Sequence, residues 1–241
     1  MQVVLLAAGQ ATRLRPLTDD RPKCLLEVAG RSILSRSVGQ LVARGLERIT
    51  IVDGYRGDMI RAALATGFPT VDFRFVRNED YATTNNAWSL MLAGCSPDEP
   101  LLLLDSDIVF EDAVLDLVLA HPAPDRLALR TEGEIGDEEM KVRLGPGGRV
   151  VDLGKGLAPA TAAGESVGIE VFSGGFVAAL APVLHRRLLV EQCLNEYYED
   201  AFLEVIKAGW PVEIVDIAGL SCLEIDTAAD LAAAQQEFAG R

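Results

Sequence analysis

The stretch that decides the fold is residues 1–23, MQVVLLAAGQATRLRPLTDDRPK. Residues 3–6 form an apolar run without alternation, which is typical of a strand buried on both faces of a parallel sheet. Ala7, Ala8 and Gly9 follow, and their small side chains leave the backbone N–H groups open to an anion. The segment therefore predicts a central strand followed by an anion-binding turn.

Four cations lie just beyond this turn: Arg13, Arg15, Arg21 and Lys23. Two prolines interrupt the segment, which favours an ordered loop over a regular helix. Clustered positive charge beside exposed N–H groups suits a polyphosphate. The plainer alternative is an ordinary strand–helix unit whose basic side chains are solvated. The two commonest phosphate-binding signatures, GxGxxG and GxxxxGK[ST], do not occur in the chain.

The rest of the chain alternates strand and helix patterns. Strands are predicted at 49–52, 72–76, 101–104, 164–172 and 211–215, and helices at 32–44, 58–65, from near 87, at 179–194, 200–207 and 228–238. Residues 141–144 and 149–153 flank a glycine-rich turn and predict a β-hairpin. This order predicts an α/β fold with a doubly wound, mostly parallel, Rossmann-like sheet. Ligands of such a sheet bind at the carboxyl ends of its strands.

Composition limits the partners of this chain. Its 241 residues are 49% hydrophobic and contain no linker-like tract, so we expect one domain over 1–241. A net charge of −14 argues against a nucleic acid or an anionic membrane as partner. The N-terminus lacks a signal-peptide pattern, and no apolar run approaches the roughly 20 residues that span a bilayer. We therefore expect a cytoplasmic protein.

Polar residues follow several of the predicted strands. Asp105 and Asp107 come directly after the strand at 101–104, and Asp226 follows another apolar segment near the C-terminus. Mg²⁺ is often bound by one or two carboxylates together with substrate phosphate oxygens, so two converging aspartates suffice for a metal site. The alternatives are a turn that ends a strand and, for Asp226, a helix N-cap.

The loop at 78–86 carries Thr84, Asn85 and Asn86 just before a predicted helix. Asparagine and threonine side chains commonly cap helix N-termini, and that is one interpretation. The other is base recognition, because an asparagine amide can both donate to and accept from a pyrimidine edge.

A family resemblance supports the functional interpretations. Residues 5–34, LLAAGQATRLRPLTDDRPKCLLEVAGRSIL, resemble the signature of nucleotidyltransferases that activate sugar phosphates and phospho-alcohols. The loop at 78–90 has the form N-x-x-Y-x-x-x-N-N-x-x-S-L, which is most similar to phosphocholine and 2-aminoethylphosphonate cytidylyltransferases. One departure is Ala11, which stands where the family commonly has a second glycine; alanine tolerates a positive φ poorly.

The resemblance implies a role for each of these segments. Residues 1–126 would bind the NTP, 127–222 the acceptor, and 223–241 would supply a metal ligand and the C-terminal helix. Arg13 and Lys23 would be the catalytic residues and would hold the leaving pyrophosphate. Asp107 and Asp226 would bind Mg²⁺. The implied nucleotide-binding residues are Leu6, Ala7, Ala8, Gly9, Thr84, Asn85, Asn86 and Asp105.

The acceptor site is implied by two further segments. The hairpin and the strand at 164–172 resemble the acceptor side of the family, which makes Lys141, Lys155 and Glu165 candidates there. Tyr198, Glu199 and Asp200 combine an aromatic ring with carboxylates, a group that favours a cationic amine. The plainer alternatives are solvated hairpin lysines and a capped helix start.

Together these features predict a Mg²⁺-dependent cytidylyltransferase. It would transfer CMP from CTP to 2-aminoethylphosphonate, phosphocholine or a similar small acceptor and release pyrophosphate. A sugar-1-phosphate or inositol-phosphate nucleotidyltransferase that uses another NTP remains open, as does a non-catalytic nucleotide-sensing module. A homodimer is also left open by the sequence.

Overall fold

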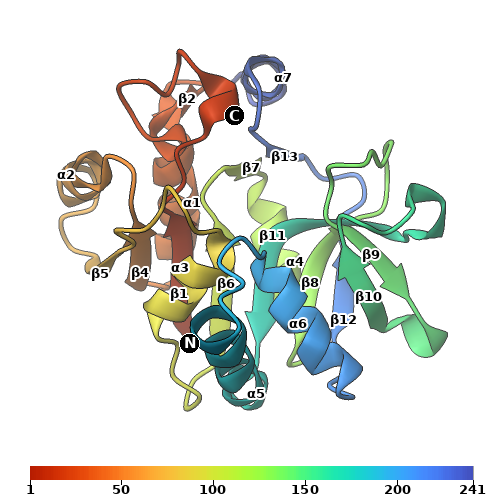
Figure 1. Cartoon of the computed structure of the whole chain (residues 1–241). Helices are drawn as coiled ribbons and strands as arrows, with labels where there is room; N and C mark the ends of the chain where they lie inside the picture. The colour runs from red at the N-terminus through yellow and green to blue at the C-terminus, as the bar shows by residue number, and fades with distance from the viewer. Residues whose placement is uncertain (241) are drawn as a thin grey trace.

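The computed structural model describes residues 1–240 and builds them around one nine-stranded sheet with helices on both faces (Figure 1). Its centre is parallel, in the order β6-β1-β4-β5. These strands are β1 (Gln2–Ala7), β4 (Arg48–Asp53), β5 (Asp72–Arg77) and β6 (Leu101–Asp105). The apolar runs of β1 and β6 are buried throughout, as a central parallel strand requires. The predicted mostly parallel α/β sheet is thus confirmed.

The remaining strands extend this sheet in antiparallel fashion. β11 (Gly164–Phe172) pairs with β6 and then with β8 (Arg126–Arg130) and β9 (Lys141–Leu144). β10 (Val150–Gly154) completes the predicted hairpin with β9, and β12 (Glu213–Asp216) runs parallel to β8. β11 is antiparallel to all three of its neighbours, β6, β8 and β9, and therefore joins the parallel half of the sheet to the hairpin.

Two helical layers cover the sheet (Figure 1). Side chains alternate along a strand, so Val4 and Leu6 pack on one face while Val3 and Leu5 pack on the other. The first face is covered by α3 (Asn86–Ala93), α5 (Gly174–His185) and α6 (Tyr198–Lys207). The second is covered by α1 (Ile33–Val42), α2 (Gly57–Gly67) and α4 (Asp112–Ala120).

A third, smaller core joins segments that are far apart in the sequence. Strand β13 (Cys222–Glu224) pairs antiparallel with β7 (Ile108–Phe110), and α7 (Ala228–Glu237) follows it. Leu14 and Leu26 of the basic loop pack here against Ile225. The loop itself contains two 3₁₀ turns, Thr12–Leu14 and Lys23–Leu25, and ends at the small hairpin of β2 (Glu27–Val28) and β3 (Arg31–Ser32). This core fixes the basic loop against the C-terminal segment.

One predicted helix begins earlier than expected. The sequence predicts a helix at 179–194, but α5 starts at Gly174 because the Ser173 hydroxyl caps it by accepting from the Phe176 N–H. The helix changes to a π-helical turn at Arg186–Val190 and stops before Gln192, whose φ of 59° lies in the left-handed region. No helix within residues 1–240 has both the length and the apolar character needed to cross a membrane.

A buried ion pair at the end of β4 gives a prediction about stability. The Asp53 carboxylate is fully buried and accepts from Arg61 Nε at 2.6 Å and Arg77 Nε at 2.9 Å. Asp53→Asn removes a charge that both guanidinium groups need, so we expect the free energy of unfolding to fall by about 2 kcal/mol in urea denaturation. Asp58, which also pairs with Arg77, is 87% exposed. Asp58→Asn should cost less than about 0.5 kcal/mol, and equal losses would contradict the role of burial.

Candidate active site

A cavity of about 360 Å³ opens at the carboxyl ends of β1, β5 and β6. It lies where a doubly wound sheet binds ligands. The residues that line it come from the N-terminal turn, the 78–89 segment, the end of β6, the region around β11 and the C-terminal segment. The lining residues from these segments include Leu6, Ala7, Ala8, Gly9, Ala11, Arg13, Lys23, Asn78, Tyr81, Thr84, Asn85, Asn86, Ser89, Asp105, Asp107, Glu138, Lys155, Gly168, Tyr197, Glu199, Glu224 and Asp226.

The predicted anion-binding turn lies at one wall of this cavity. Its Ala8 carbonyl accepts from the Tyr55 N–H at 3.0 Å, and a Cβ on Gly54 would stand 2.7 Å from the same oxygen. Glycine at this position therefore lets the end of β4 pack closely against the turn. Ala11 has φ 48° and ψ 54°, so it adopts the left-handed conformation that glycine accommodates more easily. The fold thus holds Ala11 in the backbone conformation expected of the usual glycine.

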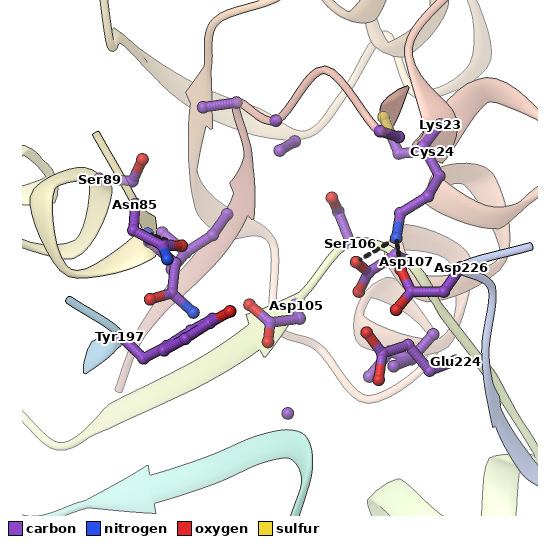
Figure 2. Close-up of a pocket in the computed structure, with 18 of the residues that line it drawn as sticks. Lys23, Cys24, Asn85, Ser89, Asp105, Ser106, Asp107, Tyr197, Glu224 and Asp226 are labelled. Atoms are coloured by element: carbon purple, nitrogen blue, oxygen red, sulfur yellow. Dashed lines mark hydrogen bonds and ion pairs between the residues drawn. The ribbon is translucent and has the colours of Figure 1, made fainter. Parts of the chain in front are cut away.

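Lys23 connects two carboxylates at the other end of the cavity. Its Nζ lies 2.7 Å from Asp107 Oδ2 and 2.8 Å from Asp226 Oδ1. Dashed lines mark these contacts in Figure 2, and Arg13 also pairs with Asp226. Asp107 and Asp226 are brought together by the pairing of β7 with β13. Just beyond these strands, the Ile225 N–H donates to the Asp107 carbonyl and extends the pairing. Burial opposes the charge of Lys23, but the two carboxylates outweigh it and raise the Lys23 pKa above its ordinary value.

Glu224 is a third member of this group, and the sequence analysis did not select it. It stands two residues before Asp226 on extended backbone, so both side chains point to the same side. That spacing is the signal that could have identified it. Glu224 is exposed at the cavity, and partial desolvation together with the charges of Asp107 and Asp226 raises its pKa above the ordinary value. A cation bound beside these three groups would favour the ionised form of Glu224.

The carboxylates fit a divalent metal. Ligand oxygens of Asp107, Glu224 and Asp226 all lie within 4.8 Å of one another. Oxygen ligands of this kind suit Mg²⁺, which is usually held by few protein groups and by substrate phosphates.

The wall predicted to bind the nucleoside is built around the start of α3. Asn85 is the N-cap of this helix, with its Oδ1 accepting from the Asn86 N–H at 2.8 Å, so the capping interpretation of Asn85 is correct. Thr84 Oγ1 donates to the Asp80 carbonyl and accepts from Asn78 Nδ2. Asn78, Tyr81 and Ser89 also line the cavity, although the sequence analysis did not choose them as site residues.

Asp105 lies between the two ends of the site (Figure 2). Its Oδ2 accepts from the Tyr198 hydroxyl at 2.8 Å. Burial, reinforced by Asp107 and Glu199, raises the pKa of Asp105 well above its ordinary value. Gly168, with φ 72°, passes so close that a Cβ there would stand 2.8 Å from the same Oδ2. The carboxyl of Asp105 is therefore held tightly by α6 and β11.

The part of the cavity predicted to bind the acceptor is lined by Lys155, Tyr197 and Glu199. Lys155 Nζ lies 4.8 Å from the centre of the Tyr197 ring, a cation–π contact. Glu199 is 6% exposed, and its Oε2 has no hydrogen-bond partner among residues 1–240. Burial raises the pKa of Glu199 to about 8. A buried carboxyl with one oxygen left without a partner at a cavity wall is suited to a cationic ligand.

Four residues predicted for the acceptor site lie elsewhere. Lys141 is fully buried, and its Nζ donates to the carbonyls of Gly136, Asp137 and Glu139, so it holds the 136–139 loop and does not reach the cavity. Glu165 pairs with Arg130. Asp200 accepts from the Tyr197 N–H in a capping box. Tyr198 is buried beneath the site. Residues beside them in the sequence, such as Tyr197 and Glu199, line the cavity, but these four side chains do not.

An α/β sheet with an anion-binding turn, a lysine and convergent carboxylates at its carboxyl edge defines a nucleotide-binding enzyme. The family is more specific: the chain belongs to the MobA-like NTP transferase domain family, whose model matches residues 3–206. The resemblance noted in residues 5–34 is thus confirmed. Members of this family are enzymes that transfer nucleotidyl groups.

Similar proteins include enzymes named for cytidylyl transfer and others named as uridylyltransferases. A CMP-5'-(3-aminopropyl)phosphonate synthase of Streptomyces rubellomurinus is 36% identical over 53% of this chain, but the match covers only 20% of that relative's length. A 2-aminoethylphosphonate cytidylyltransferase of Lancefieldella rimae is 28% identical over 95% of this chain and 90% of its own. The solved CTP:phosphocholine cytidylyltransferase of Streptococcus pneumoniae has the same fold, with a TM-score of 0.80 at 20% identity and 98% coverage of both chains.

Proposed function

We propose that this protein is a Mg²⁺-dependent cytidylyltransferase that transfers CMP from CTP to a small aminoalkylphosphonate or amino-alcohol phosphate. The observation that carries the proposal is one cavity with Lys23 between two carboxylates at one end and, at the other, a buried Glu199 whose Oε2 has no hydrogen-bond partner within residues 1–240. The first arrangement suits a triphosphate and its metal, and the second suits an ammonium group. The names of the relatives support both substrates.

The chemistry requires no nucleophile from the protein. An anionic oxygen of the acceptor attacks the α-phosphorus of CTP, a new P–O bond forms, and the bond to the β-phosphate oxygen breaks to release pyrophosphate. Catalysis then consists of positioning and charge stabilisation. Lys23 and Arg13, together with the N–H groups of the turn, would hold the phosphates of the leaving group.

The metal site would be formed by Asp107 and Asp226, with Glu224 beside them. When bound, Mg²⁺ neutralises phosphate charge and so makes the α-phosphorus easier to attack. Lys23 contacts both aspartates, so the same lysine keeps the two carboxylates close together and faces the phosphates.

The acceptor would lie with its phosphonate near Lys155 and its amine near Glu199. The sequence analysis placed Asp200 beside the amine, but Asp200 caps α6. Tyr197 supplies the ring that lines the cavity, whereas Tyr198 is buried. The proposed amine site therefore consists of Glu199 with Tyr197 at its edge.

The function is tested by supplying each NTP with a panel of acceptors and measuring pyrophosphate release. We expect CTP with 2-aminoethylphosphonate or phosphocholine to be used at least about tenfold better than glucose-1-phosphate or inositol phosphate, the scale of one charged contact. Glu199→Gln should raise the acceptor KM and leave the CTP KM nearly unchanged. Equal use of 2-hydroxyethylphosphonate by both proteins would contradict amine recognition, and no turnover with any pair would favour a nucleotide-sensing module.

A pH dependence follows from Glu199. Its pKa near 8 means that the carboxyl is mostly protonated at neutral pH in the free protein, while an ammonium ligand needs the carboxylate. We therefore expect kcat/KM for the amine acceptor to rise with pH up to about 8 and then level off, and Glu199→Gln to remove this rise. Within residues 1–240, Glu199 interacts electrostatically with five other titratable groups, which are Asp105, Glu170, Asp200, Lys155 and Tyr198.

The same shift predicts a change in stability. A carboxyl whose pKa is raised on folding binds its proton more tightly in the folded state, so it stabilises the fold below the unfolded pKa of about 4.3. That contribution is lost as the pH rises to about 8. The free energy of unfolding should fall less steeply over this range in Glu199→Gln than in the wild type. Parallel curves would contradict the raised pKa.

A further inference from the structure

The loop at 84–86 and the segment at 194–198 are joined by three hydrogen bonds. The Asn85 N–H donates to the Leu194 carbonyl at 2.9 Å, and Asn85 Nδ2 donates to the Asn195 carbonyl at 3.2 Å. Asn86 Oδ1 accepts from the Tyr198 N–H at 2.9 Å, across 112 residues of sequence. The start of α3, on the nucleoside side, is thereby attached to the start of α6, on the acceptor side.

The hydrogen bond from the Tyr198 N–H to Asn86 Oδ1 caps α6, and the residue that accepts it belongs to another helix, α3. Tyr198 is the first residue of α6, so its N–H has no partner within the helix. The capping box of Tyr197 and Asp200 satisfies other N–H groups, and Asn86 satisfies this one. Asn86 thus fixes the backbone position from which Tyr198 and Glu199 project.

The two side chains that project from this point reach the site. The Tyr198 ring is fully buried, and its hydroxyl donates to Asp105 Oδ2, so a shift of the α6 start would also move the partner of Asp105. Glu199 follows directly and lines the cavity. The Asn86 side chain also lowers the pKa of Glu199 through a side-chain hydrogen bond. Asn86 therefore acts on two adjacent residues, on Tyr198 through the backbone N–H and on Glu199 through the side chain.

These bonds fix the orientation of both amides and occupy part of their hydrogen-bonding capacity. Asn85 uses Oδ1 to accept from the Asn86 N–H and Nδ2 to donate to Asn195. Asn86 uses Oδ1 for Tyr198. Contacting a base with the Asn86 oxygen, or with either side chain in a new orientation, would require these bonds to break, whereas a remaining amide N–H could still donate to a base.

We infer that Asn86 is a positioning residue. It lies in the wall proposed to bind the nucleoside and holds the start of α6, and thus Glu199, in place for the acceptor; it does not select the base. The inference rests on the proposed function. Because Asn86 belongs to the nucleotide-binding wall, any movement of that wall on CTP binding is transmitted to Glu199. By thermodynamic linkage, the acceptor then affects CTP affinity by the same factor.

The test compares Asn86→Ala with the matched control Asn195→Ala. Asn195 is exposed, and only its backbone carbonyl is used in the contact with Asn85. In the full-length chain, Asn86→Ala should raise the KM for 2-aminoethylphosphonate by about tenfold, the effect of one lost cap or hydrogen bond, and change the CTP KM by less than about twofold. Asn195→Ala should change neither constant. In the Glu199→Gln background, Asn86→Ala should have a much smaller effect, because both changes act through the same contact.

Asn86→Asp separates positioning from a merely structural role. It keeps an oxygen for the Tyr198 N–H at a helix N-terminus, so the melting temperature should stay near the wild-type value. Its negative charge near Glu199 should nevertheless move the pH rise of acceptor kcat/KM to higher pH. An altered base preference in either Asn86 variant, additive effects with Glu199→Gln, or an unchanged acceptor KM in Asn86→Ala would overturn the inference.

The proposed function can fail separately from this inference. Absence of turnover by the wild type would reject the function. Calorimetric titration with 2-aminoethylphosphonate, with and without CTP, still measures the coupling in that case. Equal acceptor affinity in the wild type and Asn86→Ala would reject the inference alone.

Discussion

Asp226→Asn is expected to lower kcat by about 10³-fold or more at saturating Mg²⁺, and Asp107→Asn should do the same. Each change removes one charge from the proposed metal site and one partner from Lys23. Loss of a single electrostatic contact to a transition state typically costs 10²–10³ in kcat, and here two functions are lost together. Asparagine keeps an oxygen that can accept from Lys23, so the fold should persist.

The measurement is steady-state turnover over a Mg²⁺ titration, with melting temperature as the check on folding. Asp116→Asn is the matched control, because Asp116 is 64% exposed on α4 and pairs only with Arg44 among the ion pairs of residues 1–240. Its kcat should equal that of the wild type. Near-normal kcat in either site variant would show that the residue is not a metal ligand.

Lys23→Ala should lower kcat/KM by about 10²-fold or more, because the proposed leaving group loses its main cation. The Lys23 side chain is only 13% exposed, so its charge acts in a poorly solvated region and no surface residue can replace it. Lys207→Ala, at an exposed lysine near the end of α6, is the control and should be neutral.

Folding of the Lys23 variant decides how that result is interpreted. Removing the lysine leaves Asp107 and Asp226 without their shared partner, so the melting temperature should be measured with and without Mg²⁺. Stability close to wild type with Mg²⁺ present would place the loss in catalysis. A large drop in melting temperature that accounts for the lost activity would make Lys23 a structural residue.

The parallel sheet could be predicted from the sequence because buried parallel strands are continuous apolar runs. Residues 3–6 and 101–104 are such runs, and they pair directly as β1 and β6. The site residues next to these strands were also predictable, since the carboxyl end of a parallel strand has a known place in the fold. Asp105 and Asp107 line the cavity for this reason.

The acceptor side was harder to predict, because there the direction of a side chain decides its role. Tyr197 and Tyr198 are adjacent, but only Tyr197 lines the cavity while Tyr198 is buried. Lys141 and Lys155 both belong to the hairpin region, yet Lys141 is turned into the protein by the loop at 136–139. Sequence patterns identify a segment; helix phase and loop path, which depend on tertiary packing, decide which of its residues face the ligand.

The attachment of the basic loop to the C-terminal segment also affects the order in which the protein matures during synthesis. Arg13 and its partner Asp226 are 213 positions apart in the chain. At about 5–20 residues per second, a ribosome needs roughly 10 to 40 s to add the second after the first. During that interval Leu14 and Leu26 lack Ile225, the partner that covers them in the finished protein. The nascent chain therefore exposes an incomplete candidate site, which chaperones or proteases can reach, until the segment around Ile225 and Asp226 has been added.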